Sequence, residues 1–218
     1  MYVKFPKQIF YNEKIASQDL LFPCMIFLLR YKSNLDEINT TIGCILNEFD
    51  INPIPRNVDK IKQCLSVLSD EGIILLDTKV DKINTPIKLT FPKLTPWIAV
   101  HDFEINVISE LVKNPKASFK IGNLFTAIKH TAHTVNHSNN MYSSITKGYT
   151  LLSLWSGIES KTTISKYVNL LGDTDILNVK QTTVKRDVNG KESWNTTNEY
   201  SFKQIETKSQ IPIDTDLE

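Results

Sequence analysis

The chain has 218 residues, of which 41% are hydrophobic and 22% are charged, and its formal net charge is +1. This length suits one large domain or two small ones, and the hydrophobic fraction excludes wholesale disorder. The small numbers of Gly (7) and Pro (9) exclude a collagen-like or low-complexity chain. A net charge near zero argues against nucleic-acid binding unless the charges are unevenly distributed along the chain.

The composition also bears on location and on cysteine chemistry. The longest apolar run, Leu20–Leu29, is about half as long as the roughly 20 residues that a membrane span needs. The N-terminus has no signal-peptide pattern, so we expect a cytoplasmic protein that does not bind membranes. The cysteines Cys24, Cys44 and Cys64 lie among apolar neighbours and in no metal-binding spacing. Buried reduced thiols are therefore expected, with no disulfide and no metal site.

The first half of the chain shows a series of helical patterns and then two short strands. Apolar residues at helical spacing predict helices over Ser17–Tyr31, Leu35–Phe49 and about Asn57–Ser69, with Ser17 or Asp19 as the first N-cap. Gly72 is expected to stop the third helix. The runs Ile73–Leu76 and Pro86–Phe91 then read as strands around a polar loop. Three helices followed by a hairpin is the element order of a winged helix.

The second half, after a boundary at Pro92–Pro96, reads in a similar way. Helices are expected over Asp102–Val112, Ser118 to about Asn136, Ser143–Ser156 and from a cap at Ser160 to about Leu171. Two strands follow, over Ile176–Val188 and Lys191–Phe202. The Asn189-Gly190 pair between them is a strong hairpin signal, because both turn residues need a positive φ. The polar tail from Glu206 is expected to be disordered.

The two halves match when the first is shifted by 103 positions. Ile61 then falls on Ile164, Leu65 on Val168 and Leu68 on Leu171. A structural repeat is favoured over a chance match of two amphipathic helices. The expected fold class is mainly α with small β-hairpins (α+β), in two tandem winged-helix domains over residues 1–96 and 97–205, followed by an acidic tail over 206–218.

The most specific segment is Leu152–Val168. It resembles the helix-turn-helix pattern of bacterial DNA-binding proteins, in which a helix ends in a Gly and an apolar residue and a Ser caps the next helix. Here Gly157, Ile158 and Ser160 take these three positions, with Glu159 as one extra residue between the apolar residue and the Ser.

The resemblance places a DNA-reading face on the second helix of this segment and on the hairpin beyond it. Hydroxyls, amides and cations are the groups that read a major groove and pair with phosphates. The candidates are Lys161, Thr162, Thr163, Ser165, Lys166 and Asn169 on the helix and Lys180, Lys185, Arg186 and Lys191 on the hairpin. An ordinary solvated surface explains any one of these lysines, but the whole set favours DNA binding.

The first half carries a weaker version of the same face. Its candidates on the polar side of the third helix are Arg56, Asn57, Lys60 and Gln63. Neighbouring acidic residues dilute the positive charge, so this half could contact DNA or could equally serve dimerisation.

The charge is unevenly distributed along the chain. Residues 1–96 have a net charge of +1, residues 97–205 of +3 and the tail of −3. Between Leu111 and Lys166 there are seven lysines and a single acidic residue, Glu159. A basic stretch beside a helix-turn-helix pattern is what phosphate contacts require.

Three histidines, His130, His133 and His137, fall on one face of a predicted helix. No carboxylate or thiolate lies nearby to complete a metal site, so a polar helix face that could touch phosphate is favoured over metal binding. The sequence contains no phosphate-binding loop and no dinucleotide fingerprint. We therefore expect neither a catalytic activity nor a cofactor.

The opening segment Val3–Phe10 and the helix exit Leu68–Ile74 resemble the replication-initiator and replisome-organiser winged helices of plasmids and phages. In these proteins a short extended segment precedes the first helix and often mediates dimerisation. Two winged helices in one chain further resemble plasmid initiators that read repeated sites in an origin. The resemblance implies double-stranded DNA as the ligand, with a homodimer and host replication proteins as further partners.

Three functional hypotheses follow from these patterns. The leading one is a sequence-specific DNA-binding protein that initiates or organises plasmid or phage replication. The second is a dimeric transcriptional regulator on the same fold. The third is a protein-interaction scaffold whose winged helices bind only proteins.

Overall fold

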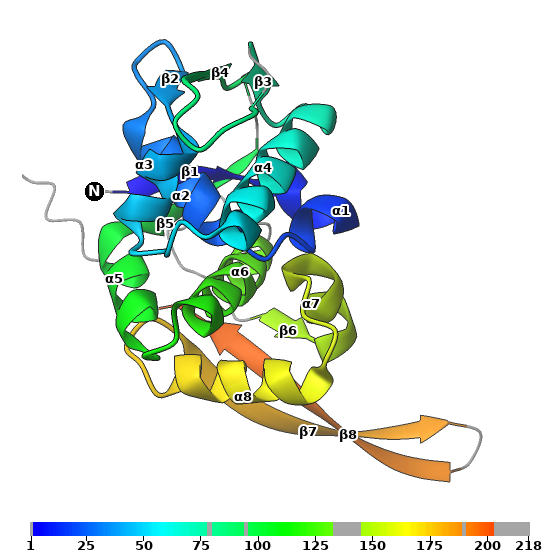
Figure 1. Cartoon of the computed structure of the whole chain (residues 1–218). Coiled ribbons are helices and arrows are strands. Elements are labelled where there is room, and N and C mark those ends of the chain that lie inside the picture. Colours follow the sequence, from blue (N-terminus) through cyan, green and yellow to red (C-terminus); the bar gives the residue numbers. More distant parts are fainter. Residues whose placement is uncertain (1, 78–79, 94–95, 133–144, 189–190, 203–218) are drawn as a thin grey trace, which may run out of the picture.

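The computed structural model describes residues 2–77, 80–93, 96–132, 145–188 and 191–202 (Figure 1). It is a mixed α+β fold with three small sheets. The first half consists of β1 (Tyr2–Pro6), the 3-10 helix η1 (Lys7–Tyr11), α1 (Glu13–Ala16), α2 (Leu21–Tyr31), β2 (Glu37–Thr40), α3 (Ile42–Glu48), α4 (Pro55–Asp70), β3 (Leu75–Leu76) and β4 (Ile87–Thr90). The second half consists of β5 (Trp97–His101), α5 (Asp102–Glu110), α6 (Pro115–Ala132), β6 (Ile145–Lys147), α7 (Tyr149–Ser156), α8 (Lys161–Gly172), β7 (Asn178–Val188) and β8 (Lys191–Ser201).

The two halves repeat one topology. In each, a long helix (α2 or α6) is followed by a strand, two helices and two more strands. The strand orders are β2-β4-β3 and β6-β8-β7, so in both sheets the last strand lies between the other two. The residues aligned by the 103-residue shift, Ile61 with Ile164 and Leu65 with Val168, are all fully buried on α4 and α8. The repeat expected from the sequence is therefore present in the topology.

A two-stranded ladder joins the halves. The first strand of each half, β1 and β5, pair antiparallel from Tyr2 opposite His101 to Pro6 opposite Trp97. Alternate residues of this ladder, among them Phe5, Ile98 and Val100, are buried in a hydrophobic core that continues through both halves. The extended opening segment thus has its pairing partner within the same chain.

Two segments predicted as the starts of helices are strands. Residues 37–40 form β2, and α3 begins only at Ile42, where the Thr41 hydroxyl accepts a hydrogen bond from the Cys44 N–H at 3.1 Å. Ile38 pairs with Leu89 of β4 and is buried, whereas Leu35, assigned to the helical face, is 78% exposed. The equivalent strand in the second half, β6, precedes α7 and pairs with β8. Long-range pairing overrides the local helical pattern in both places.

Other boundaries shift because of caps and prolines. The helix expected over Ser17–Tyr31 begins later, as α2 at Leu21, so neither Ser17 nor Asp19 caps it. A short separate helix that the sequence did not indicate, α1, precedes it and has Asn12 as its N-cap. Pro23 lies in the first turn of α2, where its missing N–H costs no intrahelical hydrogen bond. A strand that the sequence did not indicate, β5, follows directly after the predicted boundary, and His101 rather than Asp102 is the N-cap of α5.

The cysteine expectation is confirmed for two residues and wrong for the third. All three are free thiols, and Cys24 and Cys64 are fully buried, whereas Cys44 is exposed at the start of α3. A hydrogen bond with Cys24, followed by burial, raises the pKa of the Cys64 thiol well above its ordinary value, so this thiol stays protonated. In the described part of the chain no helix is long and apolar enough to cross a membrane.

Candidate nucleic-acid interface

The turn between α7 and α8 has the caps expected from the sequence. Gly157 ends α7 with φ at +66°, Ile158 is 4% exposed, and the Ser160 hydroxyl accepts a hydrogen bond from the Thr163 N–H at 3.3 Å. A Cβ at Gly157 would lie 2.2 Å from the Ala16 carbonyl oxygen of α1. The glycine therefore allows both the left-handed turn and the close approach of the first half.

The outward face of α8 is polar. Ile164, Val168 and Leu171 are fully buried, so this helix is held by its apolar side. On the other side Lys161, Thr162, Lys166 and Asn169 are exposed, and Thr163 and Ser165 are half-buried. The side chains predicted to read DNA thus share one accessible helix surface, except that Thr163 and Ser165 lie at its margin.

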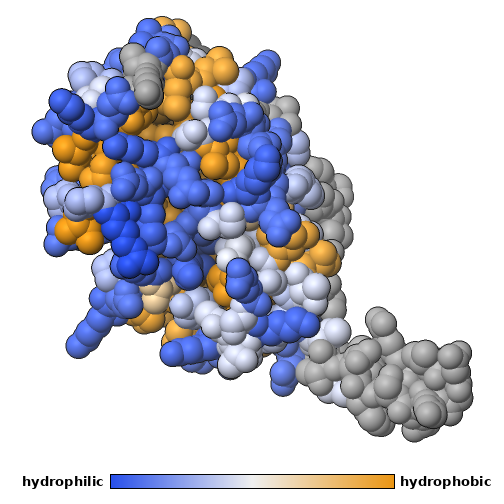
Figure 2. Space-filling view, turned by 45° about the vertical axis from the view of Figure 1, so that its right-hand side comes forward, coloured by the Kyte–Doolittle hydropathy of each residue, from blue (hydrophilic) through white to orange (hydrophobic). Residues whose placement is uncertain are grey.

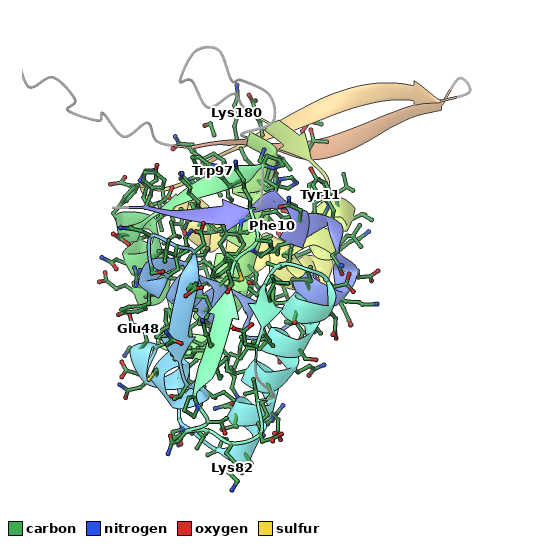
Figure 3. The ribbon with its side chains drawn as sticks, turned by 90° about the horizontal axis from the view of Figure 1, so that it is seen from above. Phe10, Tyr11, Glu48, Lys82, Trp97 and Lys180 are labelled. Atoms are coloured by element: carbon green, nitrogen blue, oxygen red, sulfur yellow. The ribbon has the colours of Figure 1, made fainter. Side chains whose placement is uncertain are left out.

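The hairpin that follows α8 is long, and the register of its strands is the one that a two-residue connection requires. Its ladder runs from Asn178 opposite Ser201 to Val188 opposite Lys191, which leaves a two-residue connection; that connection, residues 189–190, lies outside the described residues. Lys180 is exposed on β7, next to Val179, which lies against Gly172 of α8, and Figure 3 shows Lys180 at the edge of the molecule opposite Lys82 of the first half. The far end of the hairpin extends beyond the body (Figure 1).

Three hairpin candidates can be placed only by register. Lys185 lies opposite Trp194, Arg186 opposite Ser193, and Lys191 closes the ladder opposite Val188. All three belong to the extended end of the hairpin, and their side chains are outside what the structure describes.

The candidates on α4 are less uniform. Arg56 and Gln63 are exposed, whereas Lys60 is half-buried and forms an ion pair with Asp19. Asn57 is a correction: it is 5% exposed, and its side-chain amide donates a hydrogen bond to the Asn52 carbonyl at 2.8 Å. Asn57 therefore holds the loop before α4 instead of lying on the polar face.

A basic cavity lies where the two halves meet. It has a volume of about 330 Å³ and is lined by residues of α4, α6 and α8. We call it the seam pocket and define it by its polar lining residues: Asp19, Arg56, Asn57, Lys60, Asn114, Lys116, Lys120 and Tyr167. The structure thus brings three candidates of α4, Arg56, Asn57 and Lys60, next to the helix that carries the strongest DNA-reading pattern.

Electrostatics in the seam pocket centre on Asp19. Lys60 pairs with this carboxylate directly, and the Lys120 Nζ lies 3.8 Å from its Oδ1. Burial raises the pKa of Asp19, but the hydrogen bond from Lys60 and the charges of Lys60, Lys120 and Arg56 outweigh it and bring the pKa below its ordinary value. Asp19 is therefore ionised at neutral pH and offsets part of the positive charge around it.

Sequence reasoning missed Lys116 and Lys120 as site residues. Both belong to the lysine-rich stretch from Leu111 to Lys166, but the charge of that stretch does not indicate which of its lysines meet α4. One lysine of that stretch, Lys129, does not contribute to the surface. Its Nζ is buried 2.6 Å from Glu104 Oε2 and lies over the rings of Phe125 and Phe202.

The prediction that the histidines form a polar helix face is wrong for His130. This residue is 2% exposed and its ring stacks on Phe10 at a centroid distance of 4.7 Å, with Tyr11 and Trp155 edge-on at 4.9 and 5.6 Å. It packs α6 against η1, where Figure 3 shows Phe10 and Tyr11 close together, and against α7. His133 and His137 lie outside the described residues. Within the described ranges no three His, Cys, Asp or Glu side chains form a group that could hold a metal ion.

No protein-family model matches the chain, and no curated protein matches it. The functional argument therefore rests on the geometry of α4, α8, the hairpin and the seam pocket.

Proposed function

We propose that each half of the chain is a winged helix and that the protein binds double-stranded DNA through α8 and its hairpin, with α4 as a second, weaker reading helix. The observation that carries this proposal is the outward face of α8. Lys161, Thr162, Lys166 and Asn169 are all exposed on a helix that is otherwise held by fully buried residues. A helix held in this way presents its polar side to a groove as a rigid unit.

The chemistry of this face fits the major groove of DNA. Lysines pair with phosphates or guanine edges, hydroxyls reach either bases or phosphates, and an amide can bond adenine. The first turn of α8 adds backbone N–H groups and the positive end of the helix dipole, which favour a phosphate close to Lys161. The hairpin would then lie along the backbone, because β7 packs against α8 through Val179 and carries the exposed Lys180.

The proposed role is initiation or organisation of plasmid or phage replication, without a catalytic activity of its own. The repeated topology supports a chain that reads two neighbouring sites, as the resemblance to initiators implies. Because β1 pairs with β5 of the same chain, the opening segment joins the two halves. That favours one chain on two sites over the alternative of a dimeric regulator on a palindrome.

The test is DNA binding by a variant that carries Lys161→Ala and Lys166→Ala. Gel shift and fluorescence anisotropy would be measured with a random-sequence duplex of about 30 base pairs over a range of salt concentrations, because two half-sites about one helical turn apart fit on that length. We expect weaker binding and a salt slope reduced by about one for each phosphate that is no longer neutralised.

A matched control removes the same charge elsewhere. Lys4→Ala with Lys93→Ala changes two lysines outside both reading helices and both hairpins, and it should leave the salt slope nearly unchanged. If the natural chain does not bind duplex DNA even at low salt, the proposed function is wrong and the scaffold hypothesis gains support. If the α8 variant and the control behave alike, the interface lies elsewhere.

A further inference from the structure

We propose that the seam pocket binds a backbone phosphate of the same duplex that α4 and α8 read, so that the two halves recognise one bipartite site of fixed spacing. This inference rests on the proposed DNA binding and adds a residue-level site that joins the halves. The ligand chemistry is a phosphodiester anion, and its source is the DNA backbone between the two grooves.

The first argument is charge. Arg56 and Lys60 of α4 and Lys116 and Lys120 of α6 line one cavity, and Asp19 is its single carboxylate. Four cations against one ionised carboxylate leave a net charge of +3 in about 330 Å³. The whole chain has a net charge of only +1, so this concentration of charge at the junction is an excess that an anion would neutralise.

The second argument is the direction of two helices. Both α4 and α6 begin at the pocket, because Arg56 and Asn57 belong to the first turn of α4, and Lys116 and Ala117 belong to the first turn of α6. These helices have 16 and 18 residues, so each carries a full macrodipole with its positive end near the cavity. Helix N-termini that converge on lysines and an arginine form a favourable environment for an anion such as a phosphate.

The third argument is position. The pocket reaches from the first turn of α4 to Tyr167 of α8, so it lies between the two proposed reading helices. On the face shown in Figure 2, hydrophilic side chains form a band across the middle of the molecule, between the upper part with α4 and the lower part with α8. A duplex that contacts both helices would cross this band with its backbone.

The fourth argument is rigidity. The β1–β5 ladder and the close approach of Gly157 to Ala16 fix the halves relative to each other. Two reading helices on one rigid body can bind only sites whose spacing matches their own separation. A phosphate held between them would set the register of the duplex on both helices at once.

The proposal predicts that substitutions of Asp19 and of the pocket lysines change DNA affinity in opposite directions. Because its carboxylate pairs with Lys60 and lies near Lys120, it competes with a phosphate for the same cations. Asp19→Asn keeps the shape of the side chain and removes the competing charge. Under this proposal Asp19→Asn tightens DNA binding, whereas replacing Lys116 and Lys120 weakens it.

The experiment measures the full chain and three variants on the random-sequence duplex at several salt concentrations. We expect Lys116→Ala with Lys120→Ala to weaken binding about tenfold near 0.1 M salt and to reduce the salt slope by about two. Asp19→Asn should tighten binding about threefold and steepen the slope. The matched control is Lys113→Ala, an exposed lysine in the same segment that does not line the cavity. Thermal unfolding of each variant shows whether it is folded, and Asp19→Asn keeps the test decisive if the double variant is not.

The outcomes separate the two proposals. If the α8 variant no longer binds but the pocket variants bind like Lys113→Ala, DNA binding stands and the seam-pocket proposal is overturned. If the natural chain binds no duplex, both fail. Pyrophosphate could raise the melting temperature of the natural chain but not that of the variant without Lys116 and Lys120, while both bind DNA equally. The pocket would then bind a free anion, and the proposal that it binds the DNA backbone would be wrong.

The fixed spacing between the two parts of the proposed DNA site can be tested separately. Sites selected from a random duplex library should contain two conserved blocks, and an insertion of about five base pairs between them turns one block by half a helical turn. We expect that insertion to remove the contribution of the weaker block, whereas an insertion of about ten base pairs should not restore it because the halves are joined rigidly. Equal binding to all three spacings would overturn the proposal.

Discussion

The two helices proposed to read DNA, α4 and α8, have equivalent positions in the repeated topology and differ in what surrounds their cations. Around α4 the basic side chains are paired with carboxylates: Lys60 with Asp19, Lys62 with Asp59, and Lys88 of the neighbouring strand with Glu37. On α8 and the start of its hairpin, Lys161, Lys166 and Lys180 form no ion pair among the residues that the structure describes. The same topology thus carries basic side chains whose charge is partly neutralised in the first half, and basic side chains without such pairing in the second.

This difference predicts unequal roles on DNA. Phosphate binding releases counterions only where a cation is available, so α8 should supply most of the affinity and α4 a smaller share. We expect the seam pocket to make an intermediate contribution to affinity, because its lysines from α6 are added to the partly neutralised cations of α4.

The largest effect should come from a negative charge placed on each reading helix. Thr162→Glu on α8 should weaken duplex binding by about a hundredfold or more, because the new carboxylate repels phosphates and is costly to bury in a groove. Gln63→Glu, at an equally exposed neutral position of α4, should weaken it by about tenfold or less. Anisotropy titrations measure both, and equal reductions in affinity would mean that the two helices contribute alike.

The two left-handed glycines separate local strain from contact between the halves. Gly157→Ala should lower the free energy of unfolding by about 3 kcal/mol, because it strains a positive φ and places a Cβ against the backbone of α1. Gly72→Ala has a similar φ of +70° but open space around the Cβ, so about 1 kcal/mol is expected. Denaturant unfolding compares the two. Equal destabilisation would show that the approach to α1 contributes nothing.

The asparagines of the two helices should behave in opposite ways. Asn57→Ala on α4 removes the hydrogen bond to the Asn52 carbonyl and should cost about 1 kcal/mol of stability. Asn169→Ala on α8 changes an exposed side chain, so stability should change by less than about 0.5 kcal/mol while discrimination between DNA sequences decreases. Unfolding and competition binding together measure this. A destabilised Asn169 variant with unchanged discrimination would contradict the assignment of α8.

The smallest effect is the pH dependence of the Asp19 ion pair. Because the folded-state pKa of Asp19 is lowered, its contribution to stability is present above about pH 4 and is lost as the pH falls through the folded-state pKa. Asp19→Asn should therefore be less stable than the natural chain at neutral pH by about 0.5 kcal/mol or less, since the pair is partly exposed. The difference should disappear toward pH 2. A difference that grows on acidification would contradict this sign.

Much of the interface could be predicted from local patterns. The caps and turn around α8 follow from Gly157 and Ser160, because a left-handed C-terminus and a hydroxyl N-cap are properties of a few neighbouring residues. The hairpin of β7 and β8 follows from Asn189-Gly190 for the same reason, and Ile164, Val168 and Leu171 are buried as their spacing predicts. The predictions failed where distant residues compete with the local pattern, as at β2, where pairing with β4 replaces a helix.

The sequence by itself determined the matching helices α4 and α8 of the repeat and the polar face of α8, because both depend on the periodicity and the caps of continuous segments. Only the tertiary structure decided that Asn57 and His130 are buried, that β1 pairs with β5, and that Lys116 and Lys120 meet Arg56 and Lys60 around Asp19. Apart from the hydrogen bond of Asn57, which reaches only to Asn52, these contacts join segments that are far apart in the sequence, as Phe10 and His130 are, and no local propensity specifies them. They follow from the packing of the two halves on one core, which places the starts of α4 and α6 side by side.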